Sequence, residues 1–240
     1  MNGPELKIEI EGKRFDFLPP LLTGFSLTVE PSSVVALVGP SGVGKSTLLR
    51  MIGGIDTLFE GHVTIDGVAA AEAPPAGFVF QDPRLLPWLT ALDNVRVVRK
   101  ETTREQATEM LRRVGLAGSE NAYPHQLSGG MQRRVAIARA FSVNSRLLLL
   151  DEPFVSLDRA LVKEVEALLQ TLLDASRPTT VFVTHLPEDA AMLADRAVVL
   201  SGRPARIVAD YRFDSRRGAR SHSELERIAT QIAAASLEPA

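Results

Sequence analysis

A glycine-rich segment at residues 39–47 carries the clearest chemical pattern in the sequence. It reads Gly-Pro-Ser-Gly-Val-Gly-Lys-Ser-Thr, fits G-x-x-x-x-G-K-[ST], and lies between an apolar run and a helical one. Glycines let successive backbone N–H groups point inward at phosphate oxygens, and the following helix adds its positive end. We expect Lys45 to reach the β- and γ-phosphates of a nucleoside triphosphate and the Ser46 hydroxyl to ligate Mg²⁺. The predicted phosphate-binding residues are Gly39, Pro40, Ser41, Gly42, Val43, Gly44, Lys45, Ser46 and Thr47.

Two adjacent carboxylates follow a second apolar run. Residues 147–150 are all leucine, and Asp151 and Glu152 come directly after them. We assign Asp151 to the Mg²⁺ shell and Glu152 to polarising the attacking water, because phosphoryl transfer depends mainly on positioning and charge neutralisation. An acidic pair after an apolar run is by itself more often a solvated strand end or a helix cap. The phosphate-binding loop favours the catalytic interpretation.

A second anion-binding pattern lies further along the chain. Ser128, Gly129 and Gly130 precede a helix that we predict over residues 132–141. A helix N-terminus with serine and glycines can bind an anion, although an ordinary serine-capped helix would give the same pattern. One chain does not need two such sites for one γ-phosphate. The second site therefore points to a partner chain.

The elements that position these residues form a predicted sheet. Short apolar runs alternate with helical patterns, which is typical of a largely parallel sheet with crossover helices. The predicted strands are 34–38, 78–80, 147–150 and 181–183. A residue with chemical capability follows each of them: Gly39, Gln81, Asp151 and, one residue past Thr184, His185. Because ligands bind beyond the carboxyl ends of such strands, we expect one site there.

Two other regions have helical patterns. Residues 83–128 show no convincing strand and are interpreted as an inserted helical subdomain, in which Gly115 is a plausible helix stop. A terminal packing helix is predicted over residues 223–235, where Ser223 and Glu226 have capping-box spacing. Its apolar face would contain Leu225, Ile228 and Ile232.

Composition limits the classes of protein to which these patterns can belong. The chain has 240 residues, 45% hydrophobic residues and no cysteine, which indicates one large domain or a domain with a subdomain, and no disulfide framework. We expect no signal peptide and no membrane-spanning segment, since the longest apolar runs are far shorter than the roughly 20 residues required. The net charge of −2 lacks a basic block, so nucleic acid is an unexpected partner.

Taken together, these motifs resemble the nucleotide-binding subunit of an ATP-binding cassette (ABC) transporter. The matching segments are the Walker A loop at 39–47, the Q-loop Gln81, the signature at 127–132, the Walker B strand at 147–152, the D-loop at Ser156, Leu157 and Asp158, and the switch histidine His185. Members of this family usually stack an aromatic side chain on adenine. The candidate here is Phe15, with Phe17 as the alternative.

The resemblance implies a fold and a division of the chain. The expected fold is an α/β P-loop NTPase core with a mostly parallel sheet, an antiparallel N-terminal β subdomain and an inserted helical subdomain. Within one ABC ATPase domain, residues 1–82 and 141–210 would form the core with its β subdomain. Residues 83–140 would form the helical signature subdomain, and residues 211–240 the C-terminal helix.

The resemblance also implies a homodimer that closes head to tail around ATP and Mg²⁺, with each ATP held between the Walker loops of one chain and the signature helix of the other. The implied catalytic residues are Glu152, His185 and Gln81, and the implied Mg²⁺ ligands are Ser46, Gln81 and Asp151. Contacts to ATP across the dimer would come from Ser128, Gly129, Gly130, Gln132 and Asp158.

The partners implied are integral membrane permease subunits at the cytoplasmic face of the membrane and, indirectly, a periplasmic-type solute-binding protein. Residues 81–90 and 201–207 resemble the importer branch for nitrate, sulfonate, taurine or pyrimidine precursors. Two roles for Trp88 are equally favoured: it lines the groove that receives a membrane subunit, or it packs in the core. The main alternative is the ATPase of an exporter or a lipoprotein-release complex. A P-loop kinase has no need for the signature, and a DNA-repair ATPase typically contains long coiled coils that are absent here.

Overall fold

A six-stranded sheet forms the centre of the molecule. The computed structural model describes residues 3–155 and 157–237. The strand order is β10-β9-β3-β8-β7-β6, and every neighbouring pair is parallel except β9 and β10. The strands are β3 Val34–Val38, β6 Gly77–Val79, β7 Leu147–Asp151, β8 Thr179–Thr184, β9 Arg196–Ser201 and β10 Arg206–Arg212. The predicted α/β fold with a mostly parallel sheet is confirmed.

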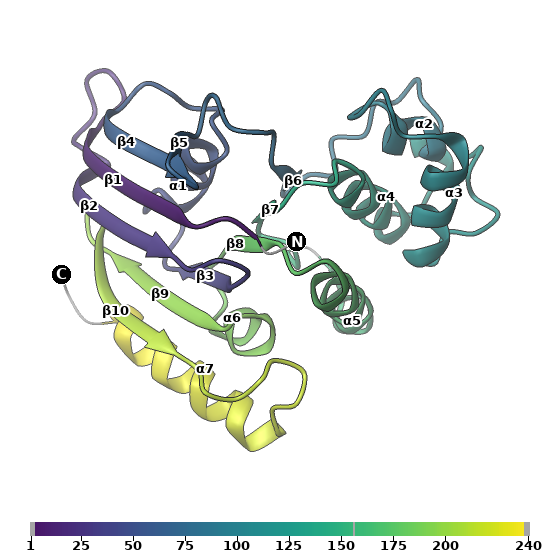
Figure 1. Cartoon of the computed structure of the whole chain (residues 1–240). Coiled ribbons are helices and arrows are strands. Elements are labelled where there is room, and N and C mark those ends of the chain that lie inside the picture. The colour runs from purple at the N-terminus through teal and green to yellow at the C-terminus, as the bar shows by residue number, and fades with distance from the viewer. Residues whose placement is uncertain (1–2, 156, 238–240) are drawn as a thin grey trace.

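A separate antiparallel sheet lies above the first (Figure 1). Its order is β2-β1-β4-β5, with strands β1 Leu6–Lys13, β2 Leu22–Val29, β4 Glu60–Ile65 and β5 Val68–Ala69. Buried and exposed residues alternate along β1, with Leu6, Ile8 and Ile10 on the buried face. Because one face of the sheet meets water, the alternation is the pattern expected for an antiparallel sheet packed on one side.

The central sheet separates two hydrophobic clusters. In β3, Val35 and Leu37 face the antiparallel sheet and α1 (Lys45–Ile52), whereas Val34, Ala36 and Val38 face the helices on the other side. All five side chains are almost fully buried. The sheet therefore has the two covered faces that a buried parallel sheet requires.

A helical lobe projects at the β6 side of the central sheet, away from the antiparallel sheet (Figure 1). It contains α2 Ala91–Arg96, α3 Arg104–Arg113, the 3₁₀ turn Pro124–Gln126 and α4 Gly129–Ser142. Gly115 follows α3 with a φ of 74°, a conformation that glycine adopts without steric cost. α4 begins at Gly129, not at residue 132 as predicted, because the Ser128 hydroxyl caps it by accepting from the Met131 N–H. The proposed subdomain boundary at residue 140 falls inside this helix.

Three helices complete the face opposite the antiparallel sheet: α5 Arg159–Ser176, α6 Pro187–Leu193 and α7 His222–Leu237. α7 begins one residue before the prediction, and its cap is Ser221, whose hydroxyl accepts from the Glu224 N–H at 3.3 Å. The capping box predicted from Ser223 and Glu226 is therefore wrong. The predicted apolar face is confirmed, since Ile228 and Ile232 are buried. Within the described residues, every helix is too short or too polar to cross a membrane.

Candidate nucleotide-binding site

The loop between β3 and α1 has the backbone geometry of a phosphate cradle. A Cβ on Gly39 would lie 2.5 Å from the Leu200 carbonyl oxygen, so only glycine fits the approach of the loop to β9. Gly44 has a φ of 111° and stands at the N-terminus of α1, where no side chain provides a cap. The first turn of α1 thus presents its N–H groups and its positive dipole end toward the loop. This arrangement suits a bound phosphate.

Lys45 is held inside the loop. Its ammonium donates to the Gly39 carbonyl at 2.7 Å and to the Pro40 carbonyl at 3.0 Å, and the residue is 4% exposed. Burial lowers the pKa of Lys45, while the negative charges of Glu152 and Asp151 counteract that shift. A buried cation with only carbonyl partners is well placed to attract a phosphate.

Ser46 and Asp151 meet at the carboxyl end of the sheet. The Ser46 hydroxyl donates to Oδ1 of Asp151 at 2.8 Å, and both line one cavity with Gln81. Hydroxyl, carboxylate and amide oxygens are the donors that Mg²⁺ prefers. Within residues 3–155 and 157–237, no cluster of three or more His, Cys, Asp or Glu side chains could hold a metal ion alone. The donor set therefore fits a Mg²⁺ that is also bound by nucleotide phosphates.

Glu152 and His185 form the neighbouring pair. The His185 Nδ1 lies 3.2 Å from Oε2 of Glu152, whose side chain is 14% exposed. Glu152 has a φ of 46°, and its N–H donates to the Val183 carbonyl at 3.0 Å. A non-glycine residue held in this sparsely populated conformation is often found at functional sites. The fold thus aims the carboxylate predicted to polarise water at the predicted switch histidine.

Asp189 supports the segment that carries His185, a role the sequence did not reveal. The Thr184 hydroxyl donates to Oδ2 of Asp189 at 2.5 Å and accepts from the Leu186 N–H at 3.0 Å. Burial raises the pKa of Asp189 to about 6 despite the hydrogen bond from Thr184, and the charge of Glu188 adds to the shift. The residue stands in α6, four positions after the histidine, and nothing in that spacing signals its burial.

A cavity of about 450 Å³ extends from the loop to the antiparallel sheet. Its lining includes Phe15, Ser41, Lys45, Gln81 and Glu152. Phe17, the alternative aromatic residue, is fully exposed and does not line it. This placement favours Phe15 over Phe17 as the residue beside the base.

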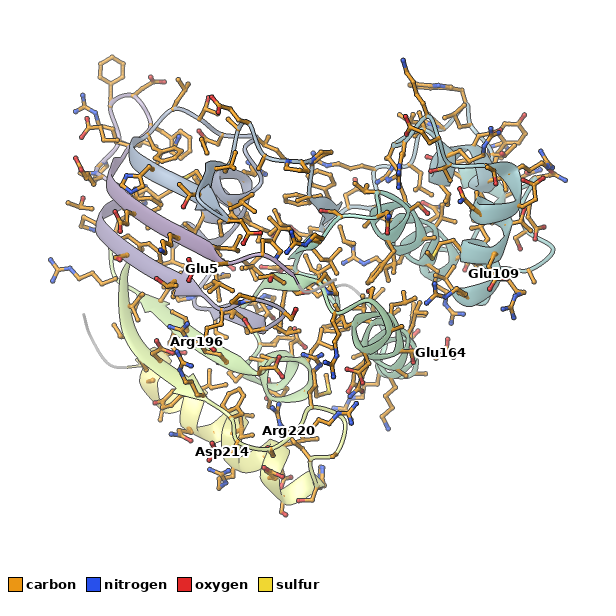
Figure 2. All side chains as sticks on the ribbon, in the orientation of Figure 1. Glu5, Glu109, Glu164, Arg196, Asp214 and Arg220 are labelled. Atoms are coloured by element: carbon orange, nitrogen blue, oxygen red, sulfur yellow. The ribbon has the colours of Figure 1, made fainter. Side chains whose placement is uncertain are left out.

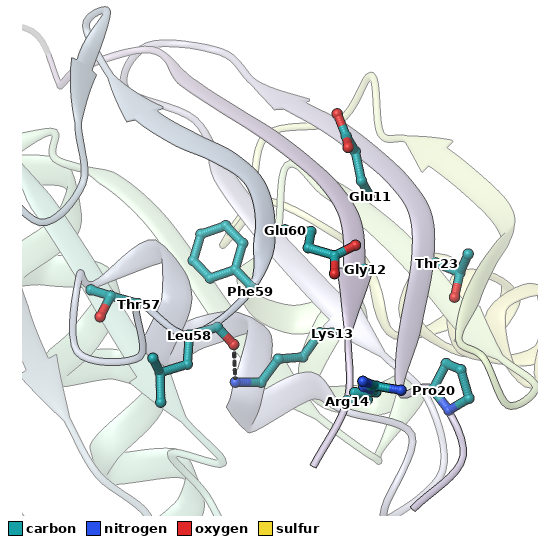
Figure 3. A pocket seen from close by; sticks show the side chains of 10 residues that line it. All are labelled: Glu11, Gly12, Lys13, Arg14, Pro20, Thr23, Thr57, Leu58, Phe59 and Glu60. Carbon is teal, nitrogen blue, oxygen red and sulfur yellow. Dashed lines mark hydrogen bonds between the residues drawn. The ribbon is translucent and has the colours of Figure 1, made fainter. Parts of the chain in front are cut away.

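The position of Phe15 is set by a buried ammonium. Lys13 lies 4.7 Å from the centre of the Phe15 ring. The same ammonium donates to Asp56 and to the Leu58 carbonyl, each at 2.8 Å, and Figure 3 shows the second contact. Figure 3 also shows that Lys13 lines a separate cavity on the antiparallel sheet, to which the phosphate-binding loop does not contribute.

The signature residues line a different cavity from the phosphate-binding loop. Ser128, Gly130 and Asp158 share a cavity of about 550 Å³ in which no residue of segment 39–47 takes part. Asp158 caps α5 by accepting from the Ala160 and Leu161 N–H groups. Gln132 uses its side-chain amide within its own chain, donating to the Pro124 and Leu127 carbonyls. Gly129 is exposed at the start of α4, and Ser156 lies outside the described residues.

Two buried arginines of α4, which the sequence analysis missed, connect the helical lobe to the Q-loop. Arg133 is 2% exposed and donates to the carbonyls of Phe80, Gln81, Glu152 and Pro153 at 2.6 to 3.1 Å. Arg139 donates to the Pro83 and Arg84 carbonyls, each at 2.7 Å. Burial lowers the pKa of both side chains. The arginines of this helical segment were the available signal, and a surface position would have explained them equally well.

Comparison with known proteins identifies the family. The ABC transporter family profile matches residues 22–155, which contain the phosphate-binding loop, the Q-loop, the signature and the Walker B strand. The chain belongs to the ABC transporter family. It is therefore an ABC ATPase, and the ATP-binding cassettes that it resembles hydrolyse ATP in transport.

Relatives cover most of the ABC ATPase chain. An uncharacterized ABC transporter ATP-binding protein of Methanocaldococcus jannaschii is 40% identical over 224 residues, 89% of this chain and 84% of that protein. An aliphatic sulfonates import ATP-binding protein of Bacillus cereus is 38% identical, over 78% of this chain and 76% of the relative. A sulfate/thiosulfate import ATP-binding protein of Brucella melitensis is 42% identical, over 82% and 59% respectively.

A solved cassette structure shares the fold. The dimeric post-hydrolysis state of an ATP-binding cassette bound to ADP and Pi aligns with a TM-score of 0.76 and 31% identity, over 90% of this chain and all of that one. The likeness confirms the ABC ATPase fold.

Proposed function

We propose that the chain is the ATP-hydrolysing subunit of an importer and works as a homodimer with two shared ATP sites. The main observation in support of a dimer is that two separate cavities exist. The Walker cavity is the one lined by the phosphate-binding loop and Glu152, and the other is lined by Ser128, Gly130 and Asp158. A γ-phosphate held by the loop of one chain would reach those signature residues only in a second copy. The dimeric cassette bound to ADP and Pi supports this arrangement.

The site residues have distinct roles in this proposal. Lys45 and the loop N–H groups bind the β- and γ-phosphates, and Phe15 stacks on the base. Ser46, Asp151 and Gln81 would hold Mg²⁺, which neutralises phosphate charge when bound. Glu152 orients the attacking water and accepts its proton, while His185, 3.2 Å from Glu152, contacts the γ-phosphate. The partner's signature residues, including Gly129 and Gln132, would complete the phosphate shell.

Output to a membrane partner would pass through the Q-loop and the helical lobe. Arg133 and Arg139 fasten residues 80–84 to α4, so a change at Gln81 is coupled mechanically to the lobe. Trp88 follows that segment and is 69% exposed, which excludes the core role considered for it. An exposed tryptophan close to the Q-loop in sequence suits contact with a permease subunit at the cytoplasmic face of the membrane.

Import of an oxyanionic solute is the direction best supported by the relatives. Two of these relatives are named as import proteins, one for aliphatic sulfonates and one for sulfate or thiosulfate. Nitrate, taurine or a pyrimidine precursor are the other solutes included in this proposal, each delivered by a solute-binding protein. The alternative is the ATPase of an exporter or a lipoprotein-release complex, which would use the same catalytic residues.

Reconstitution distinguishes the two directions. The chain and its permease are placed in liposomes with Mg-ATP inside, and a binding protein with labelled sulfonate or sulfate outside. The importer proposal predicts ATP-dependent accumulation that Glu152→Gln abolishes. ATP-dependent release of preloaded solute would favour the exporter alternative.

A further inference from the structure

The turn between β9 and β10 places an arginine in the nucleotide cavity. Arg203 lines that cavity together with Phe15, Ser41 and Lys45, although it lies more than 150 residues from them in sequence. Arg203 lies within residues 201–207, whose resemblance to the importer branch assigned no site residue. It is an additional cation at a site built to bind a polyanion.

The turn is fixed beside the loop that carries Phe15. The Ala205 N–H donates to the Leu21 carbonyl at 2.8 Å, and Ala205 also pairs with Leu22 in a parallel bridge. Leu21 in turn packs against Gly44, since a Cβ added to Gly44 would lie 3.0 Å from the Cγ of Leu21. The arginine-bearing turn is thereby held next to both the aromatic residue and the phosphate-binding loop.

The guanidinium of Arg203 has no partner among the described residues. Two other arginines on the same two strands are engaged: Arg196 forms a bidentate pair with Asp210, and Arg212 pairs with Glu30. Figure 2 labels Arg196 on this hairpin. The other cation in the cavity, Lys45, already binds two loop carbonyls. Arg203 therefore has its full donor capacity available to a ligand.

The position along the cavity indicates which part of the nucleotide Arg203 would meet. Gln81 and Glu152 mark the end at which the γ-phosphate reacts, and Phe15 marks the end of the base. The turn that carries Arg203 is hydrogen-bonded through Ala205 to Leu21, which packs against Gly44 of the phosphate-binding loop. We therefore place Arg203 between these two ends. The ribose and α-phosphate lie there in an extended nucleotide, and a guanidinium forms its strongest contacts with phosphate oxygens.

We propose that Arg203 binds the α-phosphate of the nucleotide. The contact rests on the proposed nucleotide site and adds to it a residue from the β9–β10 turn. Because ATP and ADP share the α-phosphate, Arg203 raises the affinity for both to the same degree. It acts in nucleotide binding and has no part in the chemical step.

Calorimetric titration with Mg-ADP and with a non-hydrolysable Mg-ATP analogue tests the proposal. Arg203→Ala is expected to weaken both affinities by about tenfold, the value of one charge-assisted hydrogen bond. Arg203→Lys should recover part of the loss, because it keeps the charge but not the fork of donors. The matched control is Arg206→Ala, since Arg206 is also exposed and unpartnered in the described chain but does not line the cavity.

The outcomes separate this inference from the proposed site. If Lys45→Ala weakens nucleotide binding while Arg203→Ala behaves like Arg206→Ala, the α-phosphate contact is wrong and the site stands. A loss for the ATP analogue without a loss for ADP would also overturn the inference, because it would place the contact at the γ-phosphate. If Lys45→Ala leaves the affinity of a folded protein unchanged, the proposed nucleotide site itself is wrong.

Discussion

At the scale of single residues, Phe15 illustrates how one side chain depends on another. The Lys13 ammonium lies over the Phe15 ring and is held there by hydrogen bonds to Asp56 and to the Leu58 carbonyl. The ring lines the nucleotide cavity. A ring held in this way can accept a base without first being ordered, which reduces the entropic cost of binding. Phe15 is therefore expected to contact the base, and Phe17 is not.

Phe15→Ala is expected to weaken binding of Mg-ADP by about tenfold, since stacking of a base on an aromatic ring contributes roughly 1–3 kcal/mol. Phe17→Ala is the matched control, because Phe17 is fully exposed and outside the cavity. Calorimetric titration of both variants measures the difference. Equal affinities for Mg-ADP in the two variants would contradict the assignment of Phe15 as the residue that stacks on the base. A larger loss in Phe17→Ala would reverse the assignment.

Asp189 provides a prediction about pH. Its pKa is about 6 in the folded chain and near 3.8 in the unfolded one, so between these values the folded state binds more protons. Its contribution to stability is fully present below pH 3.8 and is lost as the pH rises through about 6. Asp189→Asn keeps an oxygen for the Thr184 hydroxyl and cannot ionise.

The Asp189→Asn variant should therefore gain stability relative to the wild type as the pH rises from about 5 to about 7.5, by about 1.4 kcal/mol. Urea unfolding of both proteins at several pH values measures this difference and cancels the titration of other groups. A difference that stays constant with pH would contradict the assignment.

The residues predicted from sequence are those whose motif is contiguous. Lys45 and Ser46 follow from the loop pattern, and Asp151 and Glu152 from the end of a leucine strand. Arg133 could not be predicted because its hydrogen-bond partners lie on elements distant in sequence, and Arg203 could not because the residues that line the cavity with it are equally distant. The roles of the predicted residues in binding and catalysis remain predictions.

At the scale of elements, α4 connects the signature to the Q-loop through arginines on its inner side. Arg133 alone satisfies carbonyls of residues 80, 81, 152 and 153. Arg134 on the same helix instead pairs with Glu164 of α5, labelled in Figure 2, and that carboxylate is largely exposed. Removal of Arg133 would therefore leave buried carbonyls without a donor, whereas removal of Arg134 would leave a largely exposed carboxylate.

Arg133→Met should lower the free energy of unfolding by at least about 2 kcal/mol, because several buried carbonyls lose their donor. ATP hydrolysis should fall as well, since the backbone of Gln81 and Glu152 loses a fixed contact. The control, Arg134→Met, removes an exposed ion pair and should cost less than about 1 kcal/mol. Urea unfolding and ATPase assays compare the two variants, and similar losses in both would contradict the account.

Among the predicted strands, β3 and β7 were placed closely, whereas β8 begins two residues before the predicted range 181–183. β3 matches its predicted range, and β7 differs by one residue, because a strand buried on both faces is a continuous apolar run. The starts of α4 and α7 were misplaced because Gly129 resembles a loop residue and Ser221 competes with Ser223 as a cap. The antiparallel sheet was expected from the family resemblance alone.

At the scale of the whole molecule, the proposed function gives each chain two incomplete halves of an ATP site. The Walker cavity opens beside α1, and the signature cavity lies between α4 and α5. Two copies related by a twofold axis would complete both sites at once, because such an interface places each surface opposite its complement. ATP binding is then linked to dimer formation, and hydrolysis to dimer opening.

The mass of the Glu152→Gln variant in Mg-ATP tests this claim most directly. One chain has a mass of 26.0 kDa, and the variant should bind ATP, fail to hydrolyse it, and elute with about twice that mass by light scattering. Addition of Ser128→Arg to the same variant should return the mass to that of one chain while each chain still binds one ATP. A Glu152→Gln protein that stays monomeric with ATP bound, or a double variant that still dimerises, would contradict the shared site.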